Sequence, residues 1–541
     1  MMSAHVQPVA PVVPAVAGRK ARVTRLVRSE RIASLCLLGL GSIVSVTILW
    51  VGRGETFFAD EWDFIVGRRG WTADTFLLPH GEHITVLPVV VYKLLFVVVG
   101  LHSYWPYRCV LLLVHLACVW LVFRLARRRV GDPAAALTAS FLLVLGSAWE
   151  MLLFPFEITL LGSVAFGLLA LDGLDRGGRR GDIVALVALI GATCSSSAGV
   201  PFVVGVTAEL AFRRAWRKVW IVGTPALLYG VWWLAYGRAA TARDHLSAHV
   251  RGIPLYVFHS IEAAVSAALP LPTSSVRLVL VLAALLVLVR VARNRQVLTP
   301  RLGGLAAAAL AFWSMTGLAR AEMSVGGQRY PYFGVVFLLL AAAELARGMR
   351  FDRRIGFGIC AVLAISAISN VRSLEEGGAF YRGHASTLRA ELTALTAIDA
   401  PPAEFAPEPT WDPNLQMGVY RAAVAELGSP AESMSALRAA PEDVREGADR
   451  VLLRAAPPAL SSVPSTSCAT LTRSVALASH SSRVLVDAAA PFTVHVRLFA
   501  SEFSRAGDIA VAKGRHMILL AAVHSDDRWR AGTDDDAHIC S

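Results

Sequence analysis

The chain has 541 residues, of which 55% are hydrophobic and only 17% are charged, and its mean hydropathy is +0.54. Soluble domains carry about 25% charged residues, so this composition excludes a purely soluble protein. The apolar residues stand in blocks close to the roughly 20 residues that cross a bilayer as a helix. The sequence therefore predicts an all-α membrane protein with many spans.

The net charge of +12 is unevenly divided along the chain. Residues 371–541 hold 16 of the 52 Lys and Arg and 21 of the 40 Asp and Glu, which leaves 36 and 19 for residues 1–370. The basic residues of the first part stand in short clusters between apolar runs, without a continuous stripe. This distribution is typical of cytoplasmic loops, and it argues against a nucleic-acid-binding surface.

Residues 1–31 are read as a basic cytoplasmic tail, and residues 32–370 as the transmembrane domain. The apolar run 84–101 decides the topology. If that run lies on the outer surface, 25 of the 36 basic residues of the first part face the cytoplasm, whereas a crossing there would turn every later cluster outward. We therefore predict about eleven spans in the plasma membrane, with the N-terminus cytoplasmic and the C-terminus extracytoplasmic. A second surface helix is expected at Pro254–Pro270.

The character of the chain changes after Asn370. Residues 371–467 are predicted to form an extracytoplasmic region of helix, over 380–398, and Pro-rich linker, "APPAEFAPEPTWDP". Residues 468–541 alternate in short runs such as "FTVHVRLF", which predicts a small β-rich domain. If this tail is outside the cell, Cys468 and Cys540 could form a disulfide.

The first motif with chemical potential is "FFADEWDF", which follows the first apolar run and places Asp60, Glu61 and Asp63 within four residues. A charge at the bilayer centre costs about 2.5–3.5 kcal/mol on insertion scales, so these carboxylates must lie at the water boundary. They could be the solvated start of a loop. The aromatic neighbours, however, make the surroundings half-dry, which raises the basicity of a carboxylate and suits a general base.

The second motif is "PHGEH", in the same outer loop, with His80, Glu82 and His83. Imidazole and carboxylate groups together can bind sugar hydroxyls or position a base, although a polar helix cap with Gly81 as its turn residue explains the same letters. The spacing is a weak metal signal. We therefore assign no metal and no certain cofactor, and a divalent metal is not indicated.

The third motif is "WEMLLFPFEIT", which places Glu150 and Glu157 around the outer end of the third predicted span. A Trp and two Glu here could anchor the chain at the membrane interface. They could equally form a second acidic wall of a substrate site.

The fourth motif is "LARAEMSVGGQRYPYFG", where Arg320 and Arg329 are cations on the outer side, against the positive-inside trend. Arg forms bidentate, charge-assisted bonds to phosphate oxygens. Together with Tyr330 the two Arg suit a lipid phosphate at headgroup level, and the alternative is interfacial snorkelling of the two side chains.

Taken in order, these motifs resemble the GT-C superfamily of membrane glycosyltransferases, notably the protein O-mannosyltransferase and aminoarabinose transferase branch and its uncharacterised bacterial members. The acidic pair after the first span is followed by a Pro-containing surface helix and by "GLHSYWPYRCVLLLVHLACVWLVFRLARRRVG". Further matching positions are Glu82–His83, Trp149–Glu150 with Phe156, and Arg329–Tyr330. The resemblance covers most of residues 31–370.

The resemblance implies a GT-C-like bundle and a polyprenyl-phosphate sugar donor used on the outer face, with a glycan, lipid or protein acceptor and no nucleotide. Asp60 would be the general base for an inverting transfer to a hydroxyl group, with Glu61 as the alternate candidate. Arg320, Arg329 and Tyr330 would hold the lipid phosphate. Substrate-binding roles would fall to the other acidic and His residues of the motifs: Asp63, His80, Glu82, His83, Glu150 and Glu157.

Two other function classes fit parts of the sequence. A transporter or flippase of a lipid-linked saccharide is suggested by the break "CSSSAGVP". Transporters place ionisable residues near mid-membrane, however, whereas Glu209, Glu262 and Glu344 lie near the ends of apolar runs. A non-catalytic protein that assembles the cell envelope through its outer tail is the third reading. Loss of turnover in Asp60→Asn would discriminate the enzyme from both.

Overall fold

The computed structural model describes residues 15–240, 250–320, 328–349, 352–399, 401–463, 471–472, 474–477, 482–503, 505–524, 526–533 and 538–540. Contacts divide the chain into two compact units. The membrane unit comprises residues 1–48, 112–152 and 160–374. The second unit comprises residues 49–111, 153–159 and 375–541, so it joins the loop after the first predicted span to the C-terminal part of the chain. We call it the outer unit because the sequence predicts that these segments lie outside the cell.

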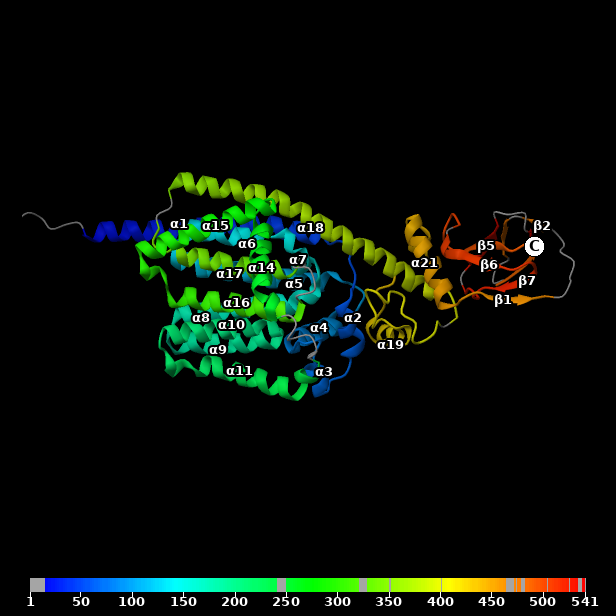
Figure 1. Cartoon of the computed structure of the whole chain (residues 1–541), viewed down its shortest axis with the longest axis horizontal. Coiled ribbons are helices and arrows are strands. Elements are labelled where there is room, and N and C mark those ends of the chain that lie inside the picture. Colours follow the sequence, from blue (N-terminus) through cyan, green and yellow to red (C-terminus); the bar gives the residue numbers. More distant parts are fainter. Residues whose placement is uncertain are drawn as a thin grey trace, which may run out of the picture. The chain divides into compact units, whose positions relative to one another are not determined.

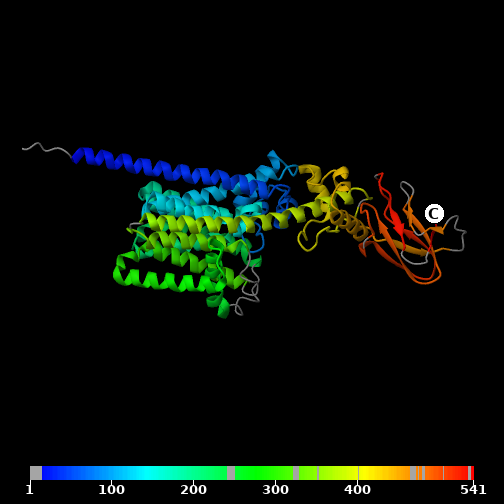
Figure 2. The same ribbon diagram turned by 90° about the horizontal axis from the view of Figure 1, so that it is seen from above.

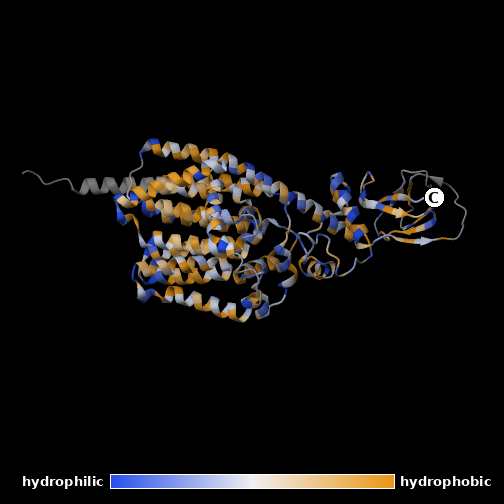
Figure 3. Cartoon of the chain, viewed as in Figure 1, coloured by the Kyte–Doolittle hydropathy of each residue, from blue (hydrophilic) through white to orange (hydrophobic). Residues whose placement is uncertain are grey.

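The membrane unit is a bundle of helices, coloured apolar along most of their length in Figure 3. Within the described residues, seven helices are long and apolar enough to cross a membrane. The helices of this unit, some of which continue into the outer unit, are α1 Ala15–Val51, α5 Trp105–Val130, α6 Asp132–Leu143, α7 Trp149–Leu153, α8 Ile158–Arg176, α9 Gly178–Ser195, α10 Val200–Phe212, α11 Trp220–Trp232, α12 Arg238–Ala240, α14 Ile253–Ala268, α15 Thr273–Arg293, α16 Pro300–Arg320, α17 Tyr330–Leu345 and α18 Arg353–Leu395.

The multi-span helical fold agrees with the sequence, and the number of about eleven spans remains a prediction. The run 84–101 forms a helix of only 13 residues, α4 Val86–Val98. At 1.5 Å per residue this helix is about 20 Å long, shorter than the roughly 30 Å hydrocarbon core, which suits the predicted surface helix. Residues 380–398 were expected as a separate helix, but α18 runs unbroken for 43 residues.

Small residues bring α10 and α16 into close contact. A Cβ atom on Gly205 would lie 2.8 Å from the carbonyl oxygen of Gly304 and 2.7 Å from the Cβ of Ala308, and one on Gly304 would lie 2.7 Å from the carbonyl oxygen of Gly205. Membrane helices associate through such small residues because the lipid offers no hydrophobic gain. Figure 1 shows these helices side by side, with α9 next to α10.

The first outer loop and the chain after α18 supply the helices of the outer unit. Its loop helices are α2 Asp60–Gly67, α3 Ala73–Leu77 and α4, and α2 packs against α19 from the tail. The tail helices are α19 Met417–Leu427, α20 Met434–Arg438 and α21 Glu442–Ala455. The segment read as a Pro-rich linker therefore leads into an ordered set of short helices.

The C-terminal residues form two antiparallel sheets, visible in Figure 2. Their orders are β1-β7-β4-β9-β2 and β3-β8-β5-β6. The strands are β1 Ala459–Ser462, β2 Leu471–Thr472, β3 Ser474–Ala476, β4 Arg483–Ala488, β5 Phe492–Arg497, β6 Asp508–Val511, β7 Gly514–Leu519, β8 Arg530–Gly532 and β9 His538–Cys540. The predicted β region is confirmed, and in β5 Phe492, Val494 and Val496 are buried while the residues between them are half-buried. The suggested disulfide cannot be followed, because Cys468 lies outside the described residues.

Candidate active site

The start of α2 sets the geometry of the first motif. Ala59, immediately before the helix, has φ of 43°, a conformation that L-residues rarely adopt. Its backbone N–H donates a hydrogen bond to the Asp412 carboxylate, which helps to hold this conformation. Asp60, Glu61 and Asp63 then occupy the first turn of α2, where the helix dipole favours negative charge. Strain of this kind is typical of residues held for a functional reason.

His80 lies between two of these carboxylates. Its Nε2 atom is 3.4 Å from Asp60 Oδ1, and its Nδ1 atom is 3.2 Å from Asp63 Oδ2. Burial alone would lower the pKa of His80, but the hydrogen bonds and charges of Asp60 and Asp63 outweigh it and raise the pKa to about 9. At neutral pH the group is therefore an imidazolium bridging two carboxylates. The side chain of Asp60 remains 41% exposed, whereas that of His80 is 13% exposed.

A tight turn and one arginine position His80. His80 and His83 exchange both backbone hydrogen bonds, at 2.9 and 3.0 Å, and the turn between them uses Gly81 at φ of +53°. The Arg68 guanidinium donates to the backbone carbonyls of the preceding residues, Asp74, Thr75, Leu78 and Pro79, at 2.8–3.3 Å. The loop that carries His80 is thus held in place by hydrogen bonds to its own backbone.

Glu61 has a different environment from its neighbour Asp60. It is completely buried, and its carboxylate accepts hydrogen bonds from the Tyr92 hydroxyl at 2.5 Å, the Tyr104 hydroxyl at 2.7 Å and the Phe58 N–H at 3.0 Å. Burial raises the pKa of Glu61 to about 8, against the lowering effect of these three bonds. The Glu61 carboxyl group is therefore enclosed by protein in this structure, whereas the Asp60 side chain is 41% exposed. The choice of Glu61 as the alternate base stays a prediction.

A loop of the tail packs against the same helix. The Asp412 carboxylate, besides accepting from Ala59, lies 3.1 Å from His384 Nε2. The Asn414 side-chain amide donates to Asp63. Sequence reasoning missed His384, Asp412 and Asn414, because nothing local marks a residue of a Pro-rich segment as a partner for a residue 350 positions earlier.

One ligand atom each of Asp60, Asp63 and His80 lies within 4.8 Å of the others, so this group could hold a divalent cation if the cation displaced the proton of His80. Among the residues that the structure describes, no other group of three or more His, Cys, Asp and Glu side chains has this spacing. Glu82, which the weak sequence signal included, is exposed, and His83 is half-buried with no place in the group.

The third and fourth motifs meet within the membrane unit. Arg329 Nε donates to Glu150 Oε2 at 2.8 Å, and both side chains are partly exposed. Tyr330 begins α17, and its ring lies 6.4 Å from that of Phe312. The side chain of Arg320 lies outside what the structure describes.

Glu157 belongs to the outer unit and is completely buried. Its carboxylate adds to the electrostatic field that raises the pKa of Tyr92 far above the ordinary value, although burial is the main cause. This position suits a packing role in the outer unit better than a contact with substrate.

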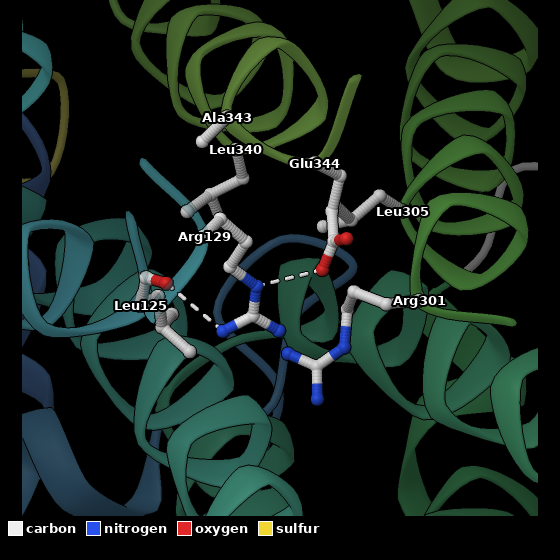
Figure 4. A pocket seen from close by; sticks show the side chains of 7 residues that line it. All are labelled: Leu125, Arg129, Arg301, Leu305, Leu340, Ala343 and Glu344. Carbon is white, nitrogen blue, oxygen red and sulfur yellow. Dashed lines mark hydrogen bonds and ion pairs between the residues drawn. The ribbon is translucent and has the colours of Figure 1, made fainter. Parts of the chain in front are cut away.

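A buried ionic cluster, which we call the arginine cluster, ties the membrane helices together at the basic ends of α5 and α16. Arg129 pairs with Asp175 and with Glu344 at 2.7 Å, and Arg301 pairs with Asp175 at 2.9 Å and with Glu209 at 2.7 Å. Figure 4 shows the two guanidinium groups lining a small pocket with Glu344. Because each carboxylate of this group is paired with an arginine of another helix, the group joins α5, α8, α10, α16 and α17.

Comparison with known proteins adds one similarity. Among solved structures, the chain is similar to the crystal structure of ArnT from Cupriavidus metallidurans in the apo state, with 14% sequence identity, coverage of 79% of this chain and 93% of ArnT, and a TM-score of 0.42. A scan against models of protein families gives no match, and a search of the curated proteins gives none either. The function is therefore best judged from the site itself.

Proposed function

We propose that this protein is a membrane glycosyltransferase that moves a sugar from a polyprenyl-phosphate donor to a hydroxyl group of a cell-envelope acceptor on the outer face of the membrane. The observation that carries the proposal is the Asp60–His80–Asp63 arrangement. It combines an exposed carboxylate with a partly buried imidazolium that a second carboxylate holds in place.

In this reaction Asp60 is the general base. Its carboxylate accepts the proton of the acceptor hydroxyl while the hydroxyl oxygen forms a bond to the anomeric carbon of the donor. The bond between that carbon and the phosphate oxygen breaks, the electron pair leaves with the polyprenyl phosphate, and the anomeric configuration inverts. His80 orients the Asp60 carboxylate before the substrate arrives.

We assign the lipid phosphate to the fourth motif, with Arg329, Tyr330 and Arg320. An arginine can neutralise the charge that develops on a leaving phosphate. In the structure the Arg329 side chain is already oriented by Glu150. Glu150 is therefore proposed to position Arg329, and a donor phosphate would have to share or replace this contact.

The transporter alternative rested on the break "CSSSAGVP", and the acidic residues Glu209, Glu262 and Glu344 gave it no support because they lie near the ends of apolar runs. Each of these is paired with a basic side chain: Glu209 with Arg301, Glu262 with Arg277 and Glu344 with Arg129. The break after Cys194 is a turn that joins two separate helices, α9 and α10. These observations argue against a transporter, and the assay below separates the transferase from a non-catalytic envelope protein.

The test uses the purified full chain in lipid vesicles with a panel of radiolabelled polyprenyl-phosphate sugars. Transfer to envelope extract is expected with at least one donor, and Asp60→Asn should lower its rate by about 10²-fold or more, the size of a lost general base. Asp443→Asn, which removes an exposed carboxylate of α21, is the matched control and should leave the rate unchanged. Equal turnover in wild type and Asp60→Asn would refute the proposed base.

A further inference from the structure

Two aromatic side chains of the outer unit are exposed to solvent and pack on a buried phenylalanine. Trp411 is 47% exposed and Phe380, on α18, is 39% exposed, and their rings meet edge to face with centroids 5.6 Å apart. Both rest on the buried ring of Phe58, at 5.7 and 6.0 Å. We call Trp411 and Phe380 the aromatic platform.

The backbone around Trp411 is held in place next to the carboxylates of the site. Its neighbour Asp412 is buried and accepts a hydrogen bond from Ala59, the residue before Asp60. Three residues after Trp411, Asn414 donates to Asp63. Two hydrogen bonds thus hold the loop 411–414 against the start of α2. The exposed Trp411 indole therefore belongs to an ordered loop near the proposed base and not to a free linker.

The position along α18 argues against a membrane anchor. The apolar part of this helix ends near Asn370, and ten residues separate Asn370 from Phe380. Ten helical residues rise about 15 Å, which equals or exceeds the thickness of the polar headgroup layer on one side of a bilayer. Phe380 therefore lies beyond the predicted apolar run, and an exposed aromatic pair outside such a run indicates a binding surface.

The chemistry beside the platform selects the occupant. A lipid chain packed here would remove the nearby carboxylates from water without offering them hydrogen bonds, which is costly. A sugar ring presents an apolar C–H face that can pack on an aromatic ring, and hydroxyl groups at its rim that can donate to carboxylates such as Asp60 and Asp63. The site thus offers aromatic rings for the C–H face of a sugar and carboxylates for its hydroxyl groups.

We propose that the aromatic platform binds a sugar ring of the acceptor, so that the acceptor of the transfer is itself a carbohydrate chain. This inference rests on the proposed function for the identity of the reaction. The binding itself does not depend on turnover, because Trp411 and Phe380 take no part in moving the proton.

The test measures binding of neutral trisaccharides to the full chain in nanodiscs by saturation-transfer difference NMR, with mannotriose, arabinotriose and chitotriose as the probes and a Ser/Thr-rich peptide as the competing acceptor class. At least one trisaccharide should bind the wild type. Trp411→Ala should weaken that binding by about tenfold, whereas Trp411→Phe, which keeps an aromatic face, should retain most of it. Trp71→Ala, at another exposed Trp of the outer unit, is the matched control.

The outcomes separate the two proposals. Asp60→Asn keeps a side-chain oxygen that can accept a hydroxyl group, and Asp63 and the two rings remain, so this variant should lose transfer but still bind the trisaccharide within a few-fold of the wild type. Loss of transfer with retained binding supports both proposals. Retained transfer with Trp411-dependent binding overturns only the base assignment. Binding of none of the three glycans, equal binding by Trp411→Ala, or binding of the peptide alone overturns the aromatic platform. So does strong quenching of Trp411 fluorescence by brominated lipids, taken as wild type minus Trp411→Phe, because that would place the indole in the membrane.

Discussion

Asp60 and Glu61 are adjacent carboxylates with opposite surroundings. Both were candidates for the base because the sequence offers no means of telling which of two neighbours faces water. On α2 they point in different directions, so Asp60 is left exposed and Glu61 is enclosed by Tyr92 and Tyr104. Glu61 joins α2 to Tyr92 and Tyr104 through hydrogen bonds, and these bonds help to fix the position of Asp60.

Removing one of these hydroxyls should therefore cost stability. Tyr104→Phe removes a hydrogen-bond donor from the buried Glu61 carboxyl group, and a buried acceptor that loses its partner costs about 1–3 kcal/mol. The loss of the bond should also raise the pKa of Glu61 further above its ordinary value, since the Tyr104 hydroxyl lowers it. Thermal unfolding in detergent is the measurement, with Tyr420→Phe as control because that hydroxyl bonds Ser429, which is only half-buried, at 3.1 Å. An equal shift for both variants would contradict the role of Glu61.

At the scale of elements, α21 and the end of β5 are joined by one carboxylate. Asp449 accepts the backbone N–H groups of Leu498, Phe499 and Ala500 at 2.9–3.1 Å. Burial nevertheless outweighs these bonds and raises the pKa of Asp449 to about 6, above the ordinary value of 3.8. The folded form therefore holds the proton more tightly than the unfolded form does.

The sign of the pH effect follows from this difference. Stability from Asp449 is fully present below about pH 4 and is lost as the pH rises through about 6, by about 3 kcal/mol in total. Asp449→Asn does not titrate, so the stability of the wild type relative to this variant should fall between pH 4 and pH 7. Denaturant unfolding of the full chain at both pH values measures it, and a difference that does not change with pH would contradict the prediction.

The arginine cluster is the corresponding junction of the membrane helices. Asp175 joins Arg129 and Arg301, and its side chain is 8% exposed. Removing one partner of a buried ion pair leaves an uncompensated charge and costs about 3–5 kcal/mol. We expect Asp175→Asn to lower the thermal midpoint clearly, whereas Asp487→Asn, whose partner Arg515 is partly exposed, should cost at most about 1 kcal/mol. Similar midpoints for the two variants would show that the cluster does not hold the bundle.

At the scale of the whole molecule, the sidedness of the membrane decides whether the chemistry is possible. The basic clusters predict that the loop with Thr72 is outside and the turn with Arg179 is inside. In a chain without its seven native cysteines, a membrane-impermeant thiol reagent should label Thr72→Cys in intact cells, and Arg179→Cys only after lysis. Labelling of Arg179→Cys in intact cells would place Asp60 in the cytoplasm and remove the proposed outer-face reaction.

Several features followed from the sequence because they depend on neighbours along the chain. Apolar blocks predicted the helices, alternation predicted strands such as β5, and the turn at Gly81 was expected from the residue type. His80 and Asp63 were named as site residues, but their contact was not predicted, since it joins the end of one loop to the first turn of a helix 17 residues earlier.

The sequence by itself determined that this is a helical membrane protein with a small β region, because hydrophobicity and its period are properties of local segments. Only the tertiary structure decided which carboxylate is exposed, which histidine bridges the pair and which arginines pair with which acids. Those outcomes depend on burial and on distances of a few ångströms between side chains far apart in the chain. For the same reason the sequence did not mark Trp411 as a binding residue, because its place near the acidic turn follows only from the contact between its loop and α2.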